Sequence, residues 1–185
     1  MQSVIKNCCD NKFVSSIYTD QIYHLTGFIL VSTDEYVVIS HINAHGLYDG
    51  YILKRTEDIY RIDYDGKYEK KIEALYLLKN QTHDLITEDD LKDEKSPLEL
   101  ILDIAKSTHK IISIEYEDVV ISGFVDSFTE ELVTLFIVDE YGYQDGHTTI
   151  CLSSIETIAL DTDTEQDILL LYDHLKEIQD HANEN

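Results

Sequence analysis

The feature that most constrains the fold of this chain is an internal duplication. The stretches HGLYDGY (45–51) and YGYQDGH (141–147) share a Gly, two further residues and then Asp-Gly, and they lie 96 positions apart. Sliding the chain by 96 aligns residues 27–79 with 123–175 without a gap, and 15 of these 53 positions are identical. Ordinary composition gives about one identity in sixteen by chance. The sequence therefore predicts that one module of roughly 80 residues occurs twice.

The duplication divides the chain into two modules and a connection. The first module is expected at residues 1–80 and the second at residues 97–185. The segment between them, residues 81–96, is polar and acidic, which is typical of a solvated linker.

Each module is predicted to contain a helix, five strands and a second helix. The second module shows the clearest helix start, with a capping box at Ser96 and Glu99 and Pro97 at the first helical position. The closing helix of that module has a second capping box, at Thr162 and Glu165. The expected opening helices are 2–10 and one beginning at 97, and the closing helices are 67–80 and 161–181. The expected strands are 14–18, 23–31, 35–42, 50–55 and 59–64, then 110–116, 119–128, 131–144, 145–152 and 155–160.

Several repeated positions carry signals about the backbone. Gly27 and Gly123 lie inside the second strand of each module, where an isolated Gly marks a bend or a bulge. The Asp-Gly pairs are expected to reverse the third strand into the fourth, with Gly at positive φ. They are Asp49-Gly50 and Asp145-Gly146. We interpret them as architectural, the alternative being a loop that binds a ligand.

Two segments resemble a known family of small barrels. TGFILVSTDEYVVIS (26–40) and SGFVDSFTEELVTLF (122–136) each combine a Gly, apolar positions and an acidic turn into the third strand. With a short helix in front and a tight break between the fourth and fifth strands, they resemble the Sm-like family, a subset of the SH3-like barrels. The resemblance spans residues 1–65 and 97–161. It implies a mainly β fold with flanking helices (α+β), built as two tandem SH3-like or Sm-like five-stranded barrels.

The same resemblance also raises the question of RNA binding. Val37 and Val133 stand where the family's first motif has a base-contacting Asn. The Arg-Gly pair of its second motif is replaced by Arg55-Thr56 and by Cys151-Leu152. RNA binding would therefore need a local basic surface, for which the candidates are Lys54, Arg55, Arg61, Lys67, Lys70 and Lys71.

Charge is unevenly distributed between the two modules. Residues 1–96 hold 11 Lys and Arg against 17 Asp and Glu, a net charge of −6, whereas residues 97–185 hold 3 against 20, a net charge of −17. Such a surface repels nucleic-acid phosphates, which are bound by Lys and Arg. The charge serves either solubility or the attraction of a partner with a basic surface.

Few residues are candidates for metal binding or catalysis. His41, His45 and Asp49 form the closest grouping and are weak metal-binding candidates, although Ile137 and Tyr141 stand at the two His positions in the second module. Cys151 and His147 are four residues apart, and on a strand about 13 Å would separate them, too far for proton transfer. With no phosphate loop and no paired-Cys metal motif, we expect no cofactor and no enzymatic activity.

These observations favour a cytoplasmic, non-catalytic binding or regulatory protein that acts through protein contacts. Three cysteines, Cys8, Cys9 and Cys151, indicate reduced thiols. No apolar run approaches the ~18 residues of a membrane helix, and no secretory signal is visible. The alternatives are an acidic mimic of nucleic acid that inhibits a DNA- or RNA-handling protein and, third, Sm-like RNA binding. Homo-oligomerisation is compatible with each.

Overall fold

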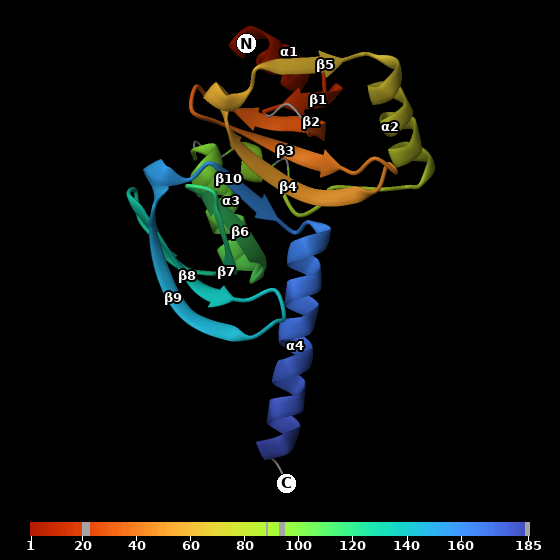
Figure 1. Cartoon of the computed structure of the whole chain (residues 1–185). Coiled ribbons are helices and arrows are strands. Elements are labelled where there is room, and N and C mark those ends of the chain that lie inside the picture. The colour runs from red at the N-terminus through yellow and green to blue at the C-terminus, as the bar shows by residue number, and fades with distance from the viewer. Residues whose placement is uncertain (20–22, 88, 93–94, 184–185) are drawn as a thin grey trace. The chain divides into compact units, whose positions relative to one another are not determined.

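The computed structural model describes residues 1–19, 23–87, 89–92 and 95–183. It contains two compact units, Met1–Ile101 and Leu102–Asn185, so that helix α3 (Pro97–Thr108) crosses the boundary. The chain is mainly β with four α-helices among the described residues, which confirms the predicted class (Figure 1). None of those helices is long and apolar enough to cross a membrane.

The first unit follows the predicted order of a helix, five strands and a helix. Its antiparallel ladder runs β5-β1-β2-β3-β4, because β1 pairs with both β2 and β5. A 3₁₀ turn, η1 (Thr56–Asp58), separates β4 from β5. The remaining elements are α1 (Gln2–Asp10), β1 (Val14–Tyr18), β2 (His24–Ser32), β3 (Tyr36–Ile42), β4 (Tyr48–Arg55), β5 (Arg61–Tyr64), α2 (Lys67–Leu78) and the 3₁₀ turn η2 (Asp90–Lys92).

The second unit repeats this arrangement. Its ladder runs β10-β6-β7-β8-β9, and η3 (Leu152–Ser154) separates β9 from β10. The capping box predicted at Ser96 and Glu99 forms: the Ser96 hydroxyl accepts a hydrogen bond from the Glu99 N–H, and the Glu99 carboxylate accepts one from the Ser96 N–H. The other elements are β6 (Ile111–Tyr116), β7 (Val119–Phe128), β8 (Leu132–Val138), β9 (Gln144–Cys151), β10 (Thr157–Leu160) and α4 (Asp163–Asn183).

Neither ladder closes on itself, so the predicted pair of closed five-stranded barrels is not shown. In the described part of the chain, no pairing joins β4 to β5 or β9 to β10. Each of the last strands has only four residues and follows a 3₁₀ turn, and within its own unit it pairs with the first strand. The sheet of each unit is therefore open.

The repeated glycines in the second strands allow two strands to approach closely. A Cβ placed on Gly27 would overlap the carbonyl oxygen of Ser40 on β3, and one on Gly123 would overlap that of Phe136 on β8. The ladder irregularity of β2 and β7 lies further on, between Ile29 and Val31 and between Val125 and Ser127. The expected bulge therefore lies near these glycines and not at them. Glycine is needed at positions 27 and 123 because a side chain there would overlap the neighbouring strand.

The reversal of the third strand into the fourth does not occur at the Asp-Gly pairs, as the sequence had suggested. The chain turns at residues 43–47 and 139–143, where Gly46 and Gly142 have φ of 70° and 84°. Gly50 and Gly146, with φ of 66° and 78°, lie inside β4 and β9 instead. At each Asp-Gly pair, two residues of the fourth strand stand opposite one residue of the third strand, which is a β-bulge. The Gly occupies the left-handed position of this bulge.

The core beneath the closing helix is also duplicated. In the first unit Ile72 and Tyr76 of α2 pack with Val14, Ile42 and Phe28. In the second unit α4 packs in the same way, through the corresponding residues Ile111, Phe124, Val138, Ile168 and Tyr172. The fold therefore places one closing helix at the same point of each sheet.

Candidate functional site

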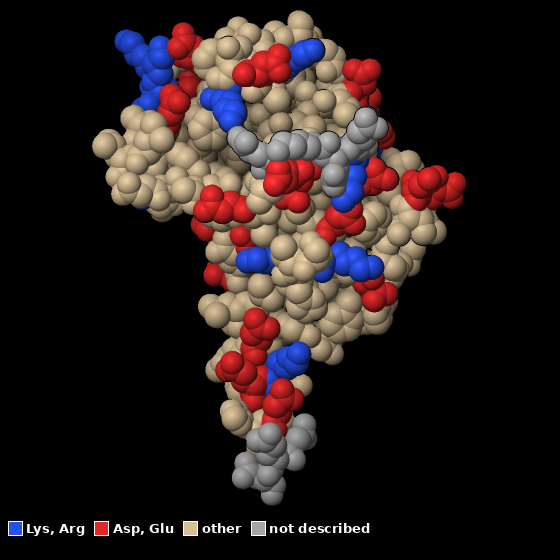
Figure 2. Space-filling view, turned by 180° about the vertical axis from the view of Figure 1, so that it is seen from behind, with Lys and Arg blue, Asp and Glu red and all other residues tan. Residues whose placement is uncertain are grey.

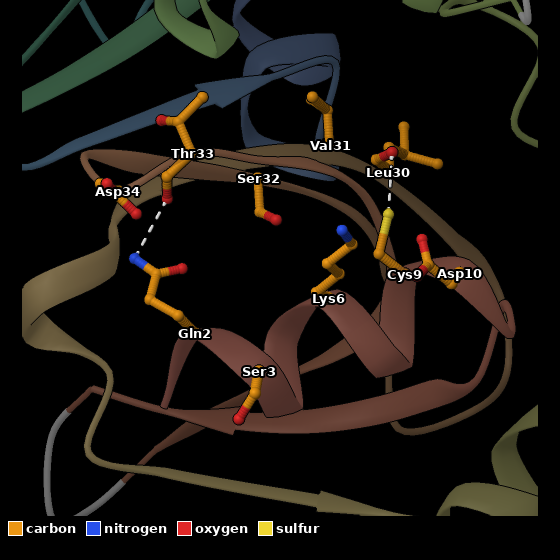
Figure 3. Close-up of a pocket in the computed structure, with 10 residues that line it drawn as sticks. All are labelled: Gln2, Ser3, Lys6, Cys9, Asp10, Leu30, Val31, Ser32, Thr33 and Asp34. Atoms are coloured by element: carbon orange, nitrogen blue, oxygen red, sulfur yellow. Dashed lines mark hydrogen bonds between the residues drawn. The ribbon is translucent and has the colours of Figure 1, made fainter.

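One hollow lies in the first unit, between α1 and β2 (Figure 3). It measures about 490 Å³, and its walls carry one cation, Lys6, and two carboxylates, Asp10 and Asp34. The Cys9 thiol donates a hydrogen bond to the Leu30 carbonyl (3.4 Å). Burial, together with Asp10 and Cys8, raises the pKa of this thiol, so it stays protonated. The lining includes no His, and it offers a polar surface rather than a nucleophile–base pair.

The predicted grouping of His41, His45 and Asp49 comes together only in part. His41 Nδ1 lies 3.0 Å from Asp49 Oδ2, although the two atoms are not aligned as a hydrogen bond. His45 is exposed on the turn, where its N–H donates to Asn43 and its carbonyl accepts from Lys79. In the described residues no group of three His, Cys, Asp or Glu side chains is placed to hold a metal ion.

A second cluster of titratable groups, missed by the sequence reasoning, surrounds His83. This imidazole accepts a hydrogen bond from the Tyr76 hydroxyl at Nδ1 and donates one from Nε2 to the His41 carbonyl, both 2.8 Å long. Its ring also contacts those of Tyr48 and Tyr51 at centroid distances of 4.5 and 5.3 Å. Burial lowers the pKa of His83 to about 4, so the neutral form is fixed in one tautomer.

The segment that carries His83 packs against the first unit, and we call residues 79–86 the strap. Ile86 is buried, and its N–H donates to the hydroxyl of Tyr51, whose pKa burial raises to about 12. Part of the predicted solvated linker therefore packs onto the first unit through Ile86 and His83, while its residues 88, 93 and 94 lie outside the described ones. The sequence pattern did not reveal this packing, because the strap is mostly polar and its partners on β3 and β4 lie more than 30 positions away.

A buried carboxylate recurs at the start of each closing helix. Glu69 accepts a hydrogen bond from Ser16 (2.6 Å), and Glu165 accepts one from Ser113 (2.5 Å). Both glutamates are almost fully buried. Glu165 also accepts hydrogen bonds from the hydroxyl and N–H of Thr162, and the second of these is one half of the predicted capping box. Because the pair is present in both units, we assign it to the architecture of the module rather than to chemistry.

Three of the candidate basic residues of the first unit lie beside carboxylates. Arg61 makes a two-pronged contact with Asp63, and Lys70 pairs with Asp65 at 2.7 Å. The Arg61 guanidinium holds the pKa of Asp63 below its usual value. Arg55 lies 3.7 Å from a carboxylate oxygen of Glu57. Neighbouring carboxylates thus offset the charge that phosphate binding would need.

Cys151 and His147 both lie on β9, four residues apart, with exposed side chains. Thr148 to Ile150 separate them along the strand. His147 instead packs against the ring of Phe136 at 5.2 Å.

The second unit has its own smaller hollow, between the β8–β9 turn and α4. It measures about 180 Å³ and is lined by Gly142 and Tyr143 of the turn, by Gln144 at the start of β9 and by Tyr172, Leu175, Lys176 and Gln179 of the helix. Tyr141 and Tyr143 beside it are 64% and 56% exposed. Large exposed tyrosines beside a hollow are typical of surfaces that contact other proteins.

Comparison with known proteins assigns no family: no protein-family model matches the chain, and no curated protein matches it either.

Proposed function

We propose that this chain is a non-catalytic binding protein whose second unit contacts a protein with a basic surface. The observation that carries the proposal is the coincidence of acidic charge and exposed apolar side chains on that unit. Residues 97–185 have a net charge of −17, from 3 Lys and 20 Asp and Glu. Eight large apolar side chains in the same unit are exposed: Val119, Val120, Leu132, Tyr141, Tyr143, Leu170, Leu171 and Ile178.

Solubility alone accounts for the carboxylates and leaves the apolar residues unexplained. Leu170 and Tyr141 are 69% and 64% exposed, which opposes solubility rather than favouring it. A partner covering both kinds of group would gain from apolar burial and from charge complementarity. The Sm-like or SH3-like character of each unit remains part of the proposal. Its support is the helix, five strands, Gly in the second strand and 3₁₀ break before the fifth.

Capture by the immobilised full chain tests the proposal. We expect basic proteins to be retained at low salt and to associate more slowly as salt rises, because ions screen beyond about 8 Å at 0.15 M. Neutralising Asp167, Asp173 and Glu177 on α4 should release them. A matched triple change in the first unit, at the exposed Asp34, Glu57 and Asp58, should not. Capture that both variants and high salt leave unchanged would overturn the proposal.

A second candidate, mimicry of nucleic acid, is favoured by the arrangement of carboxylates on α4. Asp163, Asp167, Asp173, Glu177 and Asp180 are all exposed, and helical spacing brings them onto one side. Figure 2 shows Asp and Glu side chains gathered along the projecting end of this helix. Duplex DNA competing for the captured partner would select mimicry, and capture that is indifferent to DNA would select the first candidate.

A further inference from the structure

The hollow between α1 and β2 forms where the ladder between β1 and β2 ends. This ladder reaches only to Phe28, and beyond it α1 lies alongside the rest of β2 (Figure 3). At one end of the hollow Gln2 Nε2 donates a hydrogen bond to the Thr33 carbonyl (3.5 Å). At the other end the Cys9 thiol donates to the Leu30 carbonyl. The helix and the strand are thus linked at both ends, and the space between them, about 490 Å³, is of the size that small ligands occupy.

Two donors meet in the middle of this space. The side chains of Lys6 from α1 and Ser32 from β2 both extend into it, between the two hydrogen bonds (Figure 3). Lys70 and Lys110 each pair with a carboxylate, whereas within the described part of the chain Lys6 forms no ion pair. An ammonium group beside a hydroxyl is suited to bind a carboxylate through charge-assisted hydrogen bonds.

Acceptors lie at the Gln2 end of the hollow. Because Gln2 donates to Thr33 through its amide nitrogen, its amide oxygen is turned towards the interior (Figure 3). Asp34 lies at the same end and supplies a carboxylate. Both groups accept hydrogen bonds, and the carboxylate also attracts positive charge, so this end suits an ammonium group. The hollow therefore presents complementary groups to the two charges of a zwitterion.

The groups of this hollow are not required by the duplicated module. With the 96-residue offset, Leu102 stands at the position of Lys6 and Phe128 at that of Ser32. Leu102 is fully buried, so the second unit has an apolar side chain at the position where the first unit places a cation. Residues that stabilise the fold recur in both units, as the buried glutamates of the closing helices do. The polar groups of the hollow are therefore better explained by a ligand of the first unit.

We propose that the hollow between α1 and β2 binds a small zwitterion, namely a free α-amino acid with a neutral or basic side chain. The carboxylate of the ligand accepts hydrogen bonds from Lys6 and Ser32, and its ammonium group lies against Asp34. Its side chain extends towards Cys9, where Asp10 disfavours an acidic group. This binding is a function of the first unit and is independent of the protein contact proposed for the second.

Titration of the full chain with amino acids, followed by saturation-transfer NMR and isothermal calorimetry, tests the inference. The probes are L-glutamine, L-valine and L-lysine. The comparators are glutarate, which has only anionic groups, and n-butylamine, which has only a cationic one. We expect at least one probe to bind and both comparators to bind about tenfold more weakly or worse, because each comparator loses one of the two charged contacts.

Two pairs of variants locate the site. Lys6→Met and Asp34→Asn should each weaken binding of the best probe by about tenfold or more. Their matched controls, Lys67→Met and Asp58→Asn, alter exposed residues of the same unit outside the hollow and should change the affinity by less than about threefold. Circular dichroism of each variant shows whether a loss of binding reflects unfolding.

Three results would overturn the inference. No probe binds the unmodified chain, or a comparator binds as tightly as the best probe, which would indicate recognition of one charge alone, or Lys6→Met and its control weaken binding equally. None of these results bears on the capture of basic proteins by the second unit, so the two proposals fail separately.

Discussion

At the scale of single residues, two glycines of the second unit, one at the strand reversal and one within β9, are constrained differently. Gly142 and Gly146 both have a positive φ, which costs an L-residue about 1–2 kcal/mol. A Cβ on Gly142 would in addition lie 2.6 Å from the backbone nitrogen of Tyr172, whereas one on Gly146 would meet open space. The first unit repeats the contact, between Gly46 and Leu75.

Substituting Ala for Gly142 and for Gly146 should separate the cost of backbone strain from the cost of the overlap with α4. Gly146→Ala is expected to lower the free energy of unfolding by about 1 kcal/mol, from backbone strain alone. Gly142→Ala should cost at least twice as much, because α4 must shift as well. Urea unfolding measures both, and equal losses would show that the helix moves away at no cost.

The neutral His83 makes stability depend on pH. Its pKa is 6.5 in the unfolded chain and about 4 in the folded one, so the unfolded state binds more protons between these values. Stability from this group is complete above pH 6.5 and is lost as the pH falls towards 4. Between pH 7.5 and 5.5 we expect a loss of stability on the order of 1 kcal/mol.

The measurement compares urea unfolding of the unmodified chain with that of His83→Phe at the two pH values. The variant is less stable at pH 7.5, because Tyr76 and the His41 carbonyl lose a partner, and the difference should shrink at pH 5.5. His45→Gln, at an exposed position, serves as the control. A difference that is constant with pH would contradict the assignment of His83 as neutral and buried.

At the scale of elements, the closing helices are fixed to their sheets by a buried glutamate in the first turn. Glu165→Ala removes the carboxylate that accepts hydrogen bonds from the buried Ser113 hydroxyl and the half-buried Thr162 hydroxyl. We expect a loss of about 2–4 kcal/mol. Glu177→Ala, exposed on the same helix, should change stability by about 0.5 kcal/mol or less. Similar melting temperatures for the two variants would exclude this role for Glu165.

Local patterns predicted the elements well, and long-range contacts account for what was missed. The strand expected at 119–128 coincides with β7, because its β-branched and apolar residues favour an extended chain. The reversal at Asp-Gly was wrong because a positive φ occurs both in turns and in bulges, and sequence does not distinguish them. The His83 cluster was missed because the His41 carbonyl, to which His83 Nε2 donates a hydrogen bond, lies 42 positions away in the sequence.

At the scale of the whole molecule, a net charge of −23 opposes compaction. Raising NaCl from about 0.02 to 0.5 M should increase the melting temperature, because shorter screening lengths reduce repulsion between carboxylates. A chain with Asp173→Asn and Glu177→Gln should respond less. A melting temperature that is unchanged or lower in salt would show that attractive ion pairs, such as that between Lys110 and Asp161, outweigh the repulsion.

The different exposure of the three thiols should allow the second unit alone to be labelled with a dye. Cys8 is buried, and its pKa is raised by that burial, as is the pKa of Cys9, whereas Cys151 is exposed on β9. A maleimide dye added to the folded chain should therefore attach at one position, within the second unit. Its fluorescence would follow that unit alone, with no residue substituted, and would time the arrival of any partner there.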